Sequence, residues 1–190
     1  MTRFNLAGAC LIASMIIGLT GCEKPDLSEM MKPPPRPAEL DKLVCWVGSW
    51  EGTMEMKIPG HDEVMTGSGT STVMWEADKW LLLERFEGTM GDEGTMKGLG
   101  VWTWDPKAHK YRVWSFDTFG GVSEGTATYD EETSTWHMKA KSRYLASGQK
   151  SVSEGKVKML DNDTMEWDFT EWDSLKLSKY MEGHGTSRRK

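Results

Sequence analysis

The residues best suited to binding chemistry are aromatic side chains that recur two positions apart in stretches with the alternation of β-strands. Trp102 and Trp104 form one such pair, and Trp114 and Phe116 form a second. Side chains at i and i+2 of a strand project to the same face, so each stretch presents an aromatic face. Two interpretations follow: a packed aromatic core, or an aromatic-lined pocket for an apolar or planar ligand, as is typical of small-molecule sites.

Arginines in predicted strands bear on the head group that such a ligand would carry. Arg112 shares its strand face with Trp114. If that face points inward, the guanidinium could clamp a carboxylate or a phosphate. If it points outward, Arg112 is solvated or paired across strands, which is the default because charges are seldom fully buried. The candidate ligand-binding residues are Trp102, Trp104, Arg112, Trp114, Phe116 and Arg85.

The sequence offers little for catalysis or metal binding. The string GSGTS at residues 67–71 has a glycine where a nucleophile elbow needs its serine. The four histidines lack the spacing of zinc sites, so we assign no catalytic residue, no metal ligand and no cofactor. Haem alone is left open, held by a single His137 or His184. A hydrolase or isomerase with a pair of carboxylates is the least favoured function, because the sequence does not show which carboxyls meet.

The N-terminal residues predict export and a lipid anchor. Arg3 precedes an apolar stretch over residues 6–19, which is too short for an ordinary transmembrane helix. The stretch ends in Leu19-Thr20-Gly21-Cys22, which resembles a bacterial lipobox. We therefore expect residues 1–21 to be a signal peptide that is removed, and Cys22 to be lipidated. By resemblance to lipoprotein sorting, Glu23 in place of Asp favours the outer membrane.

Residues 22–39 are predicted to be a tether, and residues 40–190 a single domain. Five of the seven prolines lie in the tether, where they favour an extended polyproline II conformation. The chain is acidic, with a net charge of −6 and no cluster of Lys and Arg before the last three residues, which argues against a nucleic-acid partner. Cys45 is the one thiol expected in the mature domain, and its apolar neighbours favour a small buried side chain over a nucleophile.

The domain reads as all-β. After a short helical turn at residues 38–44, short alternating or aromatic runs are separated by Gly, Pro, Asn and Asp. The expected strands are 46–58, 66–77, 80–90, 95–104, 111–119, 122–129, 135–145, 150–159, 164–171 and 175–182. Short connections favour antiparallel neighbours, and about ten strands exceed what a flat sheet tolerates. The pattern therefore predicts a single antiparallel up-and-down β-barrel.

A Glu-Gly-Thr tripeptide recurs at residues 51–53, 87–89, 93–95 and 124–126 with irregular spacing. Glycine inside a strand marks a bulge, a bend or a close backbone approach. We interpret these glycines as places where the barrel wall bends, and not as a phosphate cradle, because no helix pattern with Lys follows them.

Two resemblances sharpen the fold. Gly48-x-Trp50 after a helical turn resembles the entrance motif of the lipocalin and wider calycin superfamily. That resemblance implies that Trp50 plugs one end of the barrel, that Gly48 permits the tight turn, and that Arg188 or Arg189 stacks on the Trp50 ring. We assign Gly48, Trp50 and Arg188 this closing role.

A narrower resemblance covers most of residues 40–190. The strings ELDKLVCWVGSWEGT, GSGTSTVMWEADKWLLLERFEGTM, GLGVWTWDPKAHKYRVWSFDT and SEGTATYDEETSTW are similar to the bacterial family called domain of unknown function 1579. Its members are often exported or lipid-anchored. The resemblance implies a fold and no established activity.

The favoured function is binding of a small hydrophobic or amphipathic ligand in an aromatic-lined barrel that is held at the membrane through Cys22. The alternative is a solid barrel that docks a protein partner of the cell envelope through its outer face or a methionine-rich rim. That rim consists of Met54, Met56, Met65, Met90 and Met96. An open cavity in the barrel distinguishes the first function from the second.

Overall fold

The computed structural model describes residues 32–91 and 94–190. The predictions on the signal peptide, on Cys22 and on most of the tether lie outside these residues. The chain divides into two units, residues 1–35 and 36–190. Within the described residues, no helix has both the length and the apolar character needed to cross a membrane.

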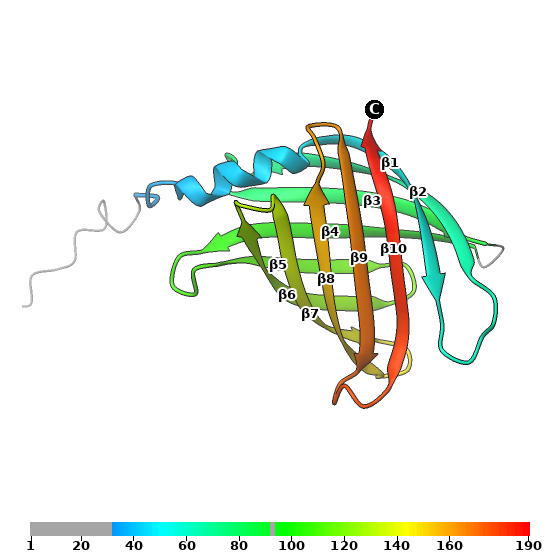
Figure 1. The fold of residues 1–190 in the computed structure, drawn as a ribbon. Coiled ribbons are helices and arrows are strands. Elements are labelled where there is room, and N and C mark those ends of the chain that lie inside the picture. Colours follow the sequence, from blue (N-terminus) through cyan, green and yellow to red (C-terminus); the bar gives the residue numbers. More distant parts are fainter. Residues whose placement is uncertain (1–31, 92–93) are drawn as a thin grey trace, which may run out of the picture. The chain divides into compact units, whose positions relative to one another are not determined.

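The second unit is a closed barrel of ten antiparallel strands, as predicted (Figure 1). A 3-10 helix, η1 (Ala38–Trp46), precedes them. The strands are β1 (Gly48–Lys57), β2 (Met65–Glu76), β3 (Leu81–Met90), β4 (Thr95–Asp105), β5 (Lys110–Asp117), β6 (Gly121–Asp130), β7 (Thr135–Tyr144), β8 (Lys150–Met159), β9 (Thr164–Asp173) and β10 (Lys179–Arg189). Each strand pairs with its sequence neighbours, and β10 closes the ring on β1 from Trp50↔Arg189 to Lys57↔Glu182.

The helix extends further than predicted and the first strand begins later. Trp46, expected to open the first strand, ends η1 instead, and β1 begins at Gly48. Leu40, Leu43 and Trp46 recur at helical spacing and are all buried, so a helix buries an apolar face that a strand would have split between inside and outside.

The helix covers the barrel end from which β1 starts, here called the capped end. Lys42 of η1 forms an ion pair with Glu131 in the β6–β7 turn, and the hydroxyl of Tyr111 donates to the Glu39 carbonyl (2.7 Å). The main core lies beneath the helix, where the rings of Trp46, Trp102 and Trp136 meet with centroids 5.4–6.2 Å apart. The apolar core is thus concentrated at the capped end of the barrel.

Glycines mark the strongly bent part of the wall. Gly52, Gly69 and Gly88 stand opposite one another across β1, β2 and β3. A Cβ placed at Gly52 would lie 2.7 Å from the Thr186 carbonyl oxygen, so the close approach of β10 requires glycine there. Two of the repeated Glu-Gly-Thr tripeptides therefore contribute to one glycine row, with Gly69 supplied by a different motif.

Candidate ligand-binding cavity

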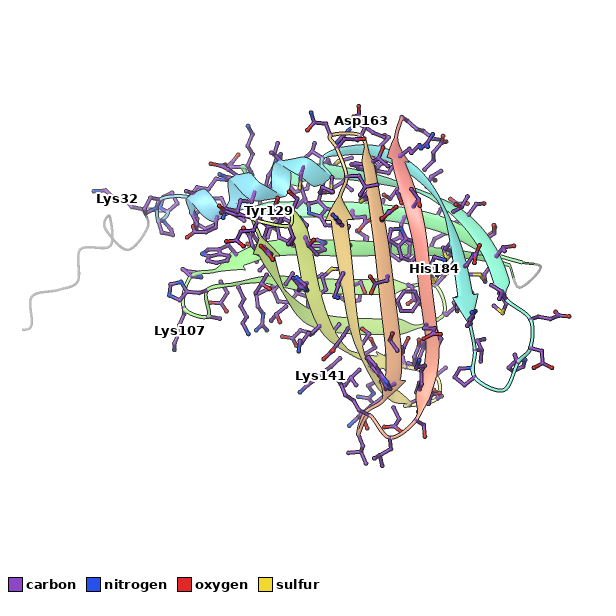
Figure 2. All side chains as sticks on the ribbon, in the orientation of Figure 1. Lys32, Lys107, Tyr129, Lys141, Asp163 and His184 are labelled. Atoms are coloured by element: carbon purple, nitrogen blue, oxygen red, sulfur yellow. The ribbon has the colours of Figure 1, made fainter. Side chains whose placement is uncertain are left out.

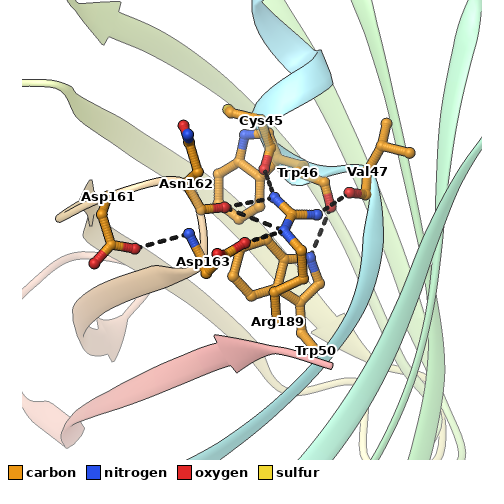
Figure 3. A network of polar contacts seen from close by, with 8 residues as sticks. All are labelled: Cys45, Trp46, Val47, Trp50, Asp161, Asn162, Asp163 and Arg189. Carbon is orange, nitrogen blue, oxygen red and sulfur yellow. Dashed lines mark hydrogen bonds and ion pairs between the residues drawn. The ribbon is translucent and has the colours of Figure 1, made fainter.

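The capped end is fastened by Arg189, whose guanidinium lies over the Trp50 ring (Figure 3). Its guanidinium carbon is 4.3 Å from the Trp50 ring centroid. The same guanidinium donates to the carbonyls of Cys45 (3.0 Å), Val47 and Asn162 (2.8 Å). Trp50 is 1% exposed, and its Nε1 donates to the Trp46 carbonyl (2.8 Å). One side chain thus ties η1, β1, β10 and the β8–β9 turn together.

The assignment of Arg188 to this role is wrong. Of the two arginines that the resemblance allowed, Arg189 is the one that faces Trp50 across the β1–β10 pair. Arg188 is exposed and stands opposite Glu51, because adjacent residues of a strand point to opposite faces. Gly48 adopts φ +137°, and its missing side chain leaves room for the Arg189 guanidinium.

Below the Arg189–Trp50 contact, here called the plug, an internal cavity of about 390 Å³ extends along the barrel. Its inward-facing wall is mostly aromatic and aliphatic, with few polar groups. The aromatic residues are Trp46, Trp50, Phe86, Trp102, Trp167 and Phe169, the other apolar ones are Met54, Met96, Val113, Met138, Val157 and Met165, and the polar ones are Ser71, Glu84 and Ser187. The remaining polar residues along the cavity have the outward parity, so their side chains leave the barrel: Glu51, Thr53, Thr70, Glu87 and Asp168. This size and composition are typical of small-ligand sites.

The cavity exists because several aromatic rings lie along the wall on glycines of the neighbouring strand. Phe86 stands opposite Gly98, and Trp167 opposite Gly185. A Cβ at either glycine would come within 2.6 Å of the facing ring. Phe169 lies on Gly183 in the same way and stacks on Trp167, with ring centroids 6.2 Å apart. Each ring is supported by backbone on the next strand and leaves the centre of the barrel free.

The predicted ligand-binding residues are divided between the two faces of the wall. Trp102 faces inward and lines the cavity. Trp104 faces inward as well, but it packs on Tyr111 near the capped end (4.8 Å between ring centroids).

Arg112, Trp114, Phe116 and Arg85 lie on the outer face. Arg112 pairs with Glu124 and lies over the Trp114 ring. Phe116 is 47% exposed, and Arg85 is exposed. The registers Trp102↔Val113 and Leu82↔Trp102 fix these orientations. The outward alternative for Arg112 is thus the observed one, and it leaves no arginine to clamp an anion in the cavity.

Glu84, which the sequence interpretation missed, is the cavity-lining carboxylate whose side chain has the inward parity. It is half-buried, and removal of water around the carboxyl raises its pKa above the usual 4.5, although a hydrogen bond with Ser71 partly offsets that rise. Its Oε2 lies over Gly100, 3.3 Å from where a Cβ would stand. Leu82, Glu84 and Phe86 alternate along the string LLLERFEG and therefore face the same side of the wall. This alternation places a charged residue on an apolar strand face, and it is the sequence signal that could have identified Glu84.

A row of serines forms a polar stripe on the opposite wall. Directly paired inward positions run from Gly100 through Ser115, Ser123, Ser142 and Ser151 to Asp173, from β4 to β9. Ser115 and Ser123 are hydrogen bonded through their hydroxyls (2.7 Å). The barrel interior therefore has an aromatic side and a hydroxyl side, which suits an amphipathic molecule.

The methionines proposed as an outer rim lie on the inner face instead. Met54 and Met96 line the cavity. Met56 and Met65 face each other, and Met90 stands opposite Gly67, all with the inward parity. All five are half-buried. They line the far end of the barrel, opposite the capped end, with flexible apolar side chains.

Histidine placement does not favour a haem in the barrel. His137 and His184 are both exposed on the outer face, and His184 lies 3.6 Å from Glu55 on the neighbouring strand (Figure 2). Neither side chain can reach an axial position inside. Within residues 32–91 and 94–190, no three His, Cys, Asp or Glu side chains gather as they would around a metal ion.

Comparisons with known proteins support the fold. No protein-family model matches the sequence, and no curated protein matches it. The structure is similar to that of Rv2717c from M. tuberculosis, with a TM-score of 0.65 and 11% identity over 82% of this chain and 99% of that one. It is also similar to the S-type phycobiliprotein lyase CPES from Guillardia theta, with a TM-score of 0.57 and 12% identity over 82% and 94% of the two chains. At these identities the likeness shows a shared barrel fold and nothing about function.

Proposed function

We propose that the protein is a lipid-anchored component of the bacterial cell envelope that holds a small hydrophobic or amphipathic ligand inside its barrel. The observation that carries the binding function is the internal cavity of about 390 Å³ with aromatic walls. The anchor is supported by the lipobox-like string that ends at Cys22, and the outer membrane by Glu23. Membership of the domain of unknown function 1579 family stays a prediction.

A second hollow, of about 720 Å³, lies on the outer face of β10, β1, β2 and β3. It is lined by backbone, Ser, Thr and charged side chains, among them Thr53, Ser68, Thr70 and Thr186, and no aromatic residue lines it. Such a surface offers a ligand hydrogen bonds that replace those it already makes with water, and it buries little apolar area. We therefore place the ligand inside.

The other two functions lose the features that would support them. The methionines point into the barrel, so they do not form an outer docking surface. An acid-pair mechanism needs a second carboxyl that faces Glu84 across the cavity. Asp168 is near in sequence to the wall residues Trp167 and Phe169, but its own side chain is exposed. The other inward carboxyls, Asp117, Glu171 and Asp173, are not among the residues that line the cavity.

Native mass spectrometry tests the binding function. The protein carrying Cys22→Ser, so that no lipid is attached, would be incubated with an envelope extract of the producing bacterium, purified and sprayed. A discrete added mass that is absent from Met54→Trp, which fills the cavity, supports the proposal. A bare protein mass across repeated extracts contradicts it.

A further inference from the structure

The charges inside the barrel are almost all negative. Among the described residues with inward parity, Glu84, Asp117, Glu171 and Asp173 are acidic, and Arg189 is basic. Arg189 is held at the capped end by Trp50, by three backbone carbonyls and by Asp163 (3.1 Å). Its charge is therefore neutralised at the capped end, and it is not available to a ligand in the open part of the cavity.

Two of the four carboxylates have a structural role in turns, and a third, Glu171, is buried beside Tyr144, to which it is hydrogen bonded, and does not line the cavity. Asp117 accepts from the backbone N–H groups of Phe119 (2.8 Å) and Gly121 (3.0 Å). Asp173 accepts from those of Leu175 (2.8 Å) and Ser178 (2.8 Å). Each closes the loop that follows its strand. These carboxylates need no ligand, but they add to the negative potential at the far end.

Glu84 has no such role. The Ser71 hydroxyl is hydrogen bonded to it, and no Lys or Arg of residues 32–91 or 94–190 forms an ion pair with it. A carboxylate in an apolar cavity is costly unless a cation or several donors satisfy it. The carboxyl group lies over Gly100 on β4 and lines the cavity of about 390 Å³, so a partner can reach it from the cavity.

The aromatic walls also favour a positively charged ligand. Phe86 is two residues from Glu84 on the same face, and Trp102 lies across the β3–β4 pair. Aromatic faces attract cations through their quadrupole, more strongly where water is excluded. An anionic head group would instead meet Glu84 with no cation to offset the repulsion.

We propose that the cavity selects a cationic amphiphile, a molecule with a protonated amine on a hydrophobic or aromatic body, and that Glu84 is its counter-ion. This proposal rests on the proposed binding function. It reverses the charge preference expected from Arg112, which lies outside. The amine lies between Glu84 and the aromatic wall, and the apolar body occupies the rest of the cavity.

Three probes with the same aromatic body test the charge preference. They are 1-naphthylmethylamine (the cation), 1-naphthylmethanol (the neutral alcohol) and 1-naphthaleneacetate (the carboxylate anion, here called the acetate). Binding to the Cys22→Ser protein would be measured by calorimetry at pH 8. We expect the amine to bind at least ten times more tightly than the acetate. Glu84→Gln should weaken amine binding about 10- to 100-fold, the range for a hydrogen bond to a charged group, and leave the alcohol unchanged.

Glu87→Gln is the matched control, because Glu87 lies on the same strand but is exposed and pairs with Lys97 (3.0 Å). It should bind all three probes like the parent protein. Thermal unfolding of both variants verifies that they fold, and Glu84→Asp, which keeps the charge, should restore part of the amine preference.

The outcomes separate this proposal from the function on which it rests. Acetate binding that equals or exceeds amine binding overturns the charge preference, as does an amine affinity that Glu84→Gln leaves unchanged. In both cases the cavity still binds, and the binding function stands. If none of the three probes binds, the proposed function fails for aromatic ligands of this size, and the charge preference fails with it.

Discussion

The guanidinium carbon of Arg189 lies over Trp50, 4.3 Å from the ring centroid, at the first paired position of β1 and β10. This contact closes the barrel between its first and last strands, whose residues are far apart in the chain. It also fixes the helix, since Arg189 binds the carbonyls of Cys45 and Val47 at the end of η1. The plug thus joins η1, β1 and β10.

Arg189→Ala should therefore destabilise the fold by about 2–4 kcal/mol, because it removes a cation–π contact and several hydrogen bonds and exposes buried carbonyls. Urea unfolding followed by tryptophan fluorescence measures the change. Arg188→Ala is the matched control and should stay within about 0.5 kcal/mol of the parent protein. Equal effects of the two substitutions would contradict the assignment of Arg189 as the closing residue.

Cys45 should be unreactive in the folded protein. Burial raises the pKa of its thiol to about 11, and the Sγ–H donates to the Lys42 carbonyl (3.2 Å). Because the thiolate is the reactive form, alkylation at pH 8 should be roughly a hundredfold slower than in the unfolded chain. The form that begins at residue 22 with Cys22→Ser has Cys45 as its single thiol, so a rate equal to that in urea would contradict this expectation.

The fold could be predicted because its signals are local. Turn residues punctuate the sequence, short connections make neighbouring strands antiparallel, and ten strands need closure. The plug motif placed Gly48 and Trp50 correctly. It could not choose between Arg188 and Arg189, since that choice depends on the register of β10 against β1.

The cavity wall could be predicted only in part, for the same reason. Trp102 and Trp114 both sit in aromatic strands, yet the β4–β5 register pairs Trp102 with Val113 and turns Trp114 outward. Both faces of these strands carry apolar residues, so hydrophobic alternation does not fix the register. Phe86 and Trp167 line the cavity because glycines lie opposite them on other strands, and that pairing is a property of the assembled sheet.

Glu84 should make the stability of the protein fall as the pH rises. Its carboxyl has a pKa near 4.5 in the unfolded chain and a higher one when folded. Between these two values the folded protein keeps a proton that the unfolded chain releases, so the free energy of unfolding decreases with pH. Glu84→Gln should remove this slope and be more stable than the parent protein above the folded pKa.

Urea unfolding of the ligand-free protein between pH 5 and 9 measures this difference. The carboxyls of Glu154, Asp173 and Glu182, whose pKa values are lowered by hydrogen bonds, affect both proteins equally and cancel in the comparison. Glu87→Gln should follow the parent curve. Parallel curves for Glu84→Gln and the parent would contradict an uncompensated buried carboxyl.

Met54→Trp should abolish ligand binding with little effect on the fold. Met54 projects into the cavity beside Gly67 and Gly88, and the flexible Met90 side chain is its neighbour there. An indole there fills much of the cavity of about 390 Å³. We expect at least a tenfold loss of affinity for 1-naphthylmethanol, with a stability change within about 1–2 kcal/mol because apolar volume replaces open space.

Met74→Trp supplies the control, since Met74 lies on the outer face of β2 and is 39% exposed. It adds the same indole to the protein without entering the barrel, so it should bind like the parent. Were both variants to bind equally well, the ligand would have to lie outside the barrel, and the binding function would need another site.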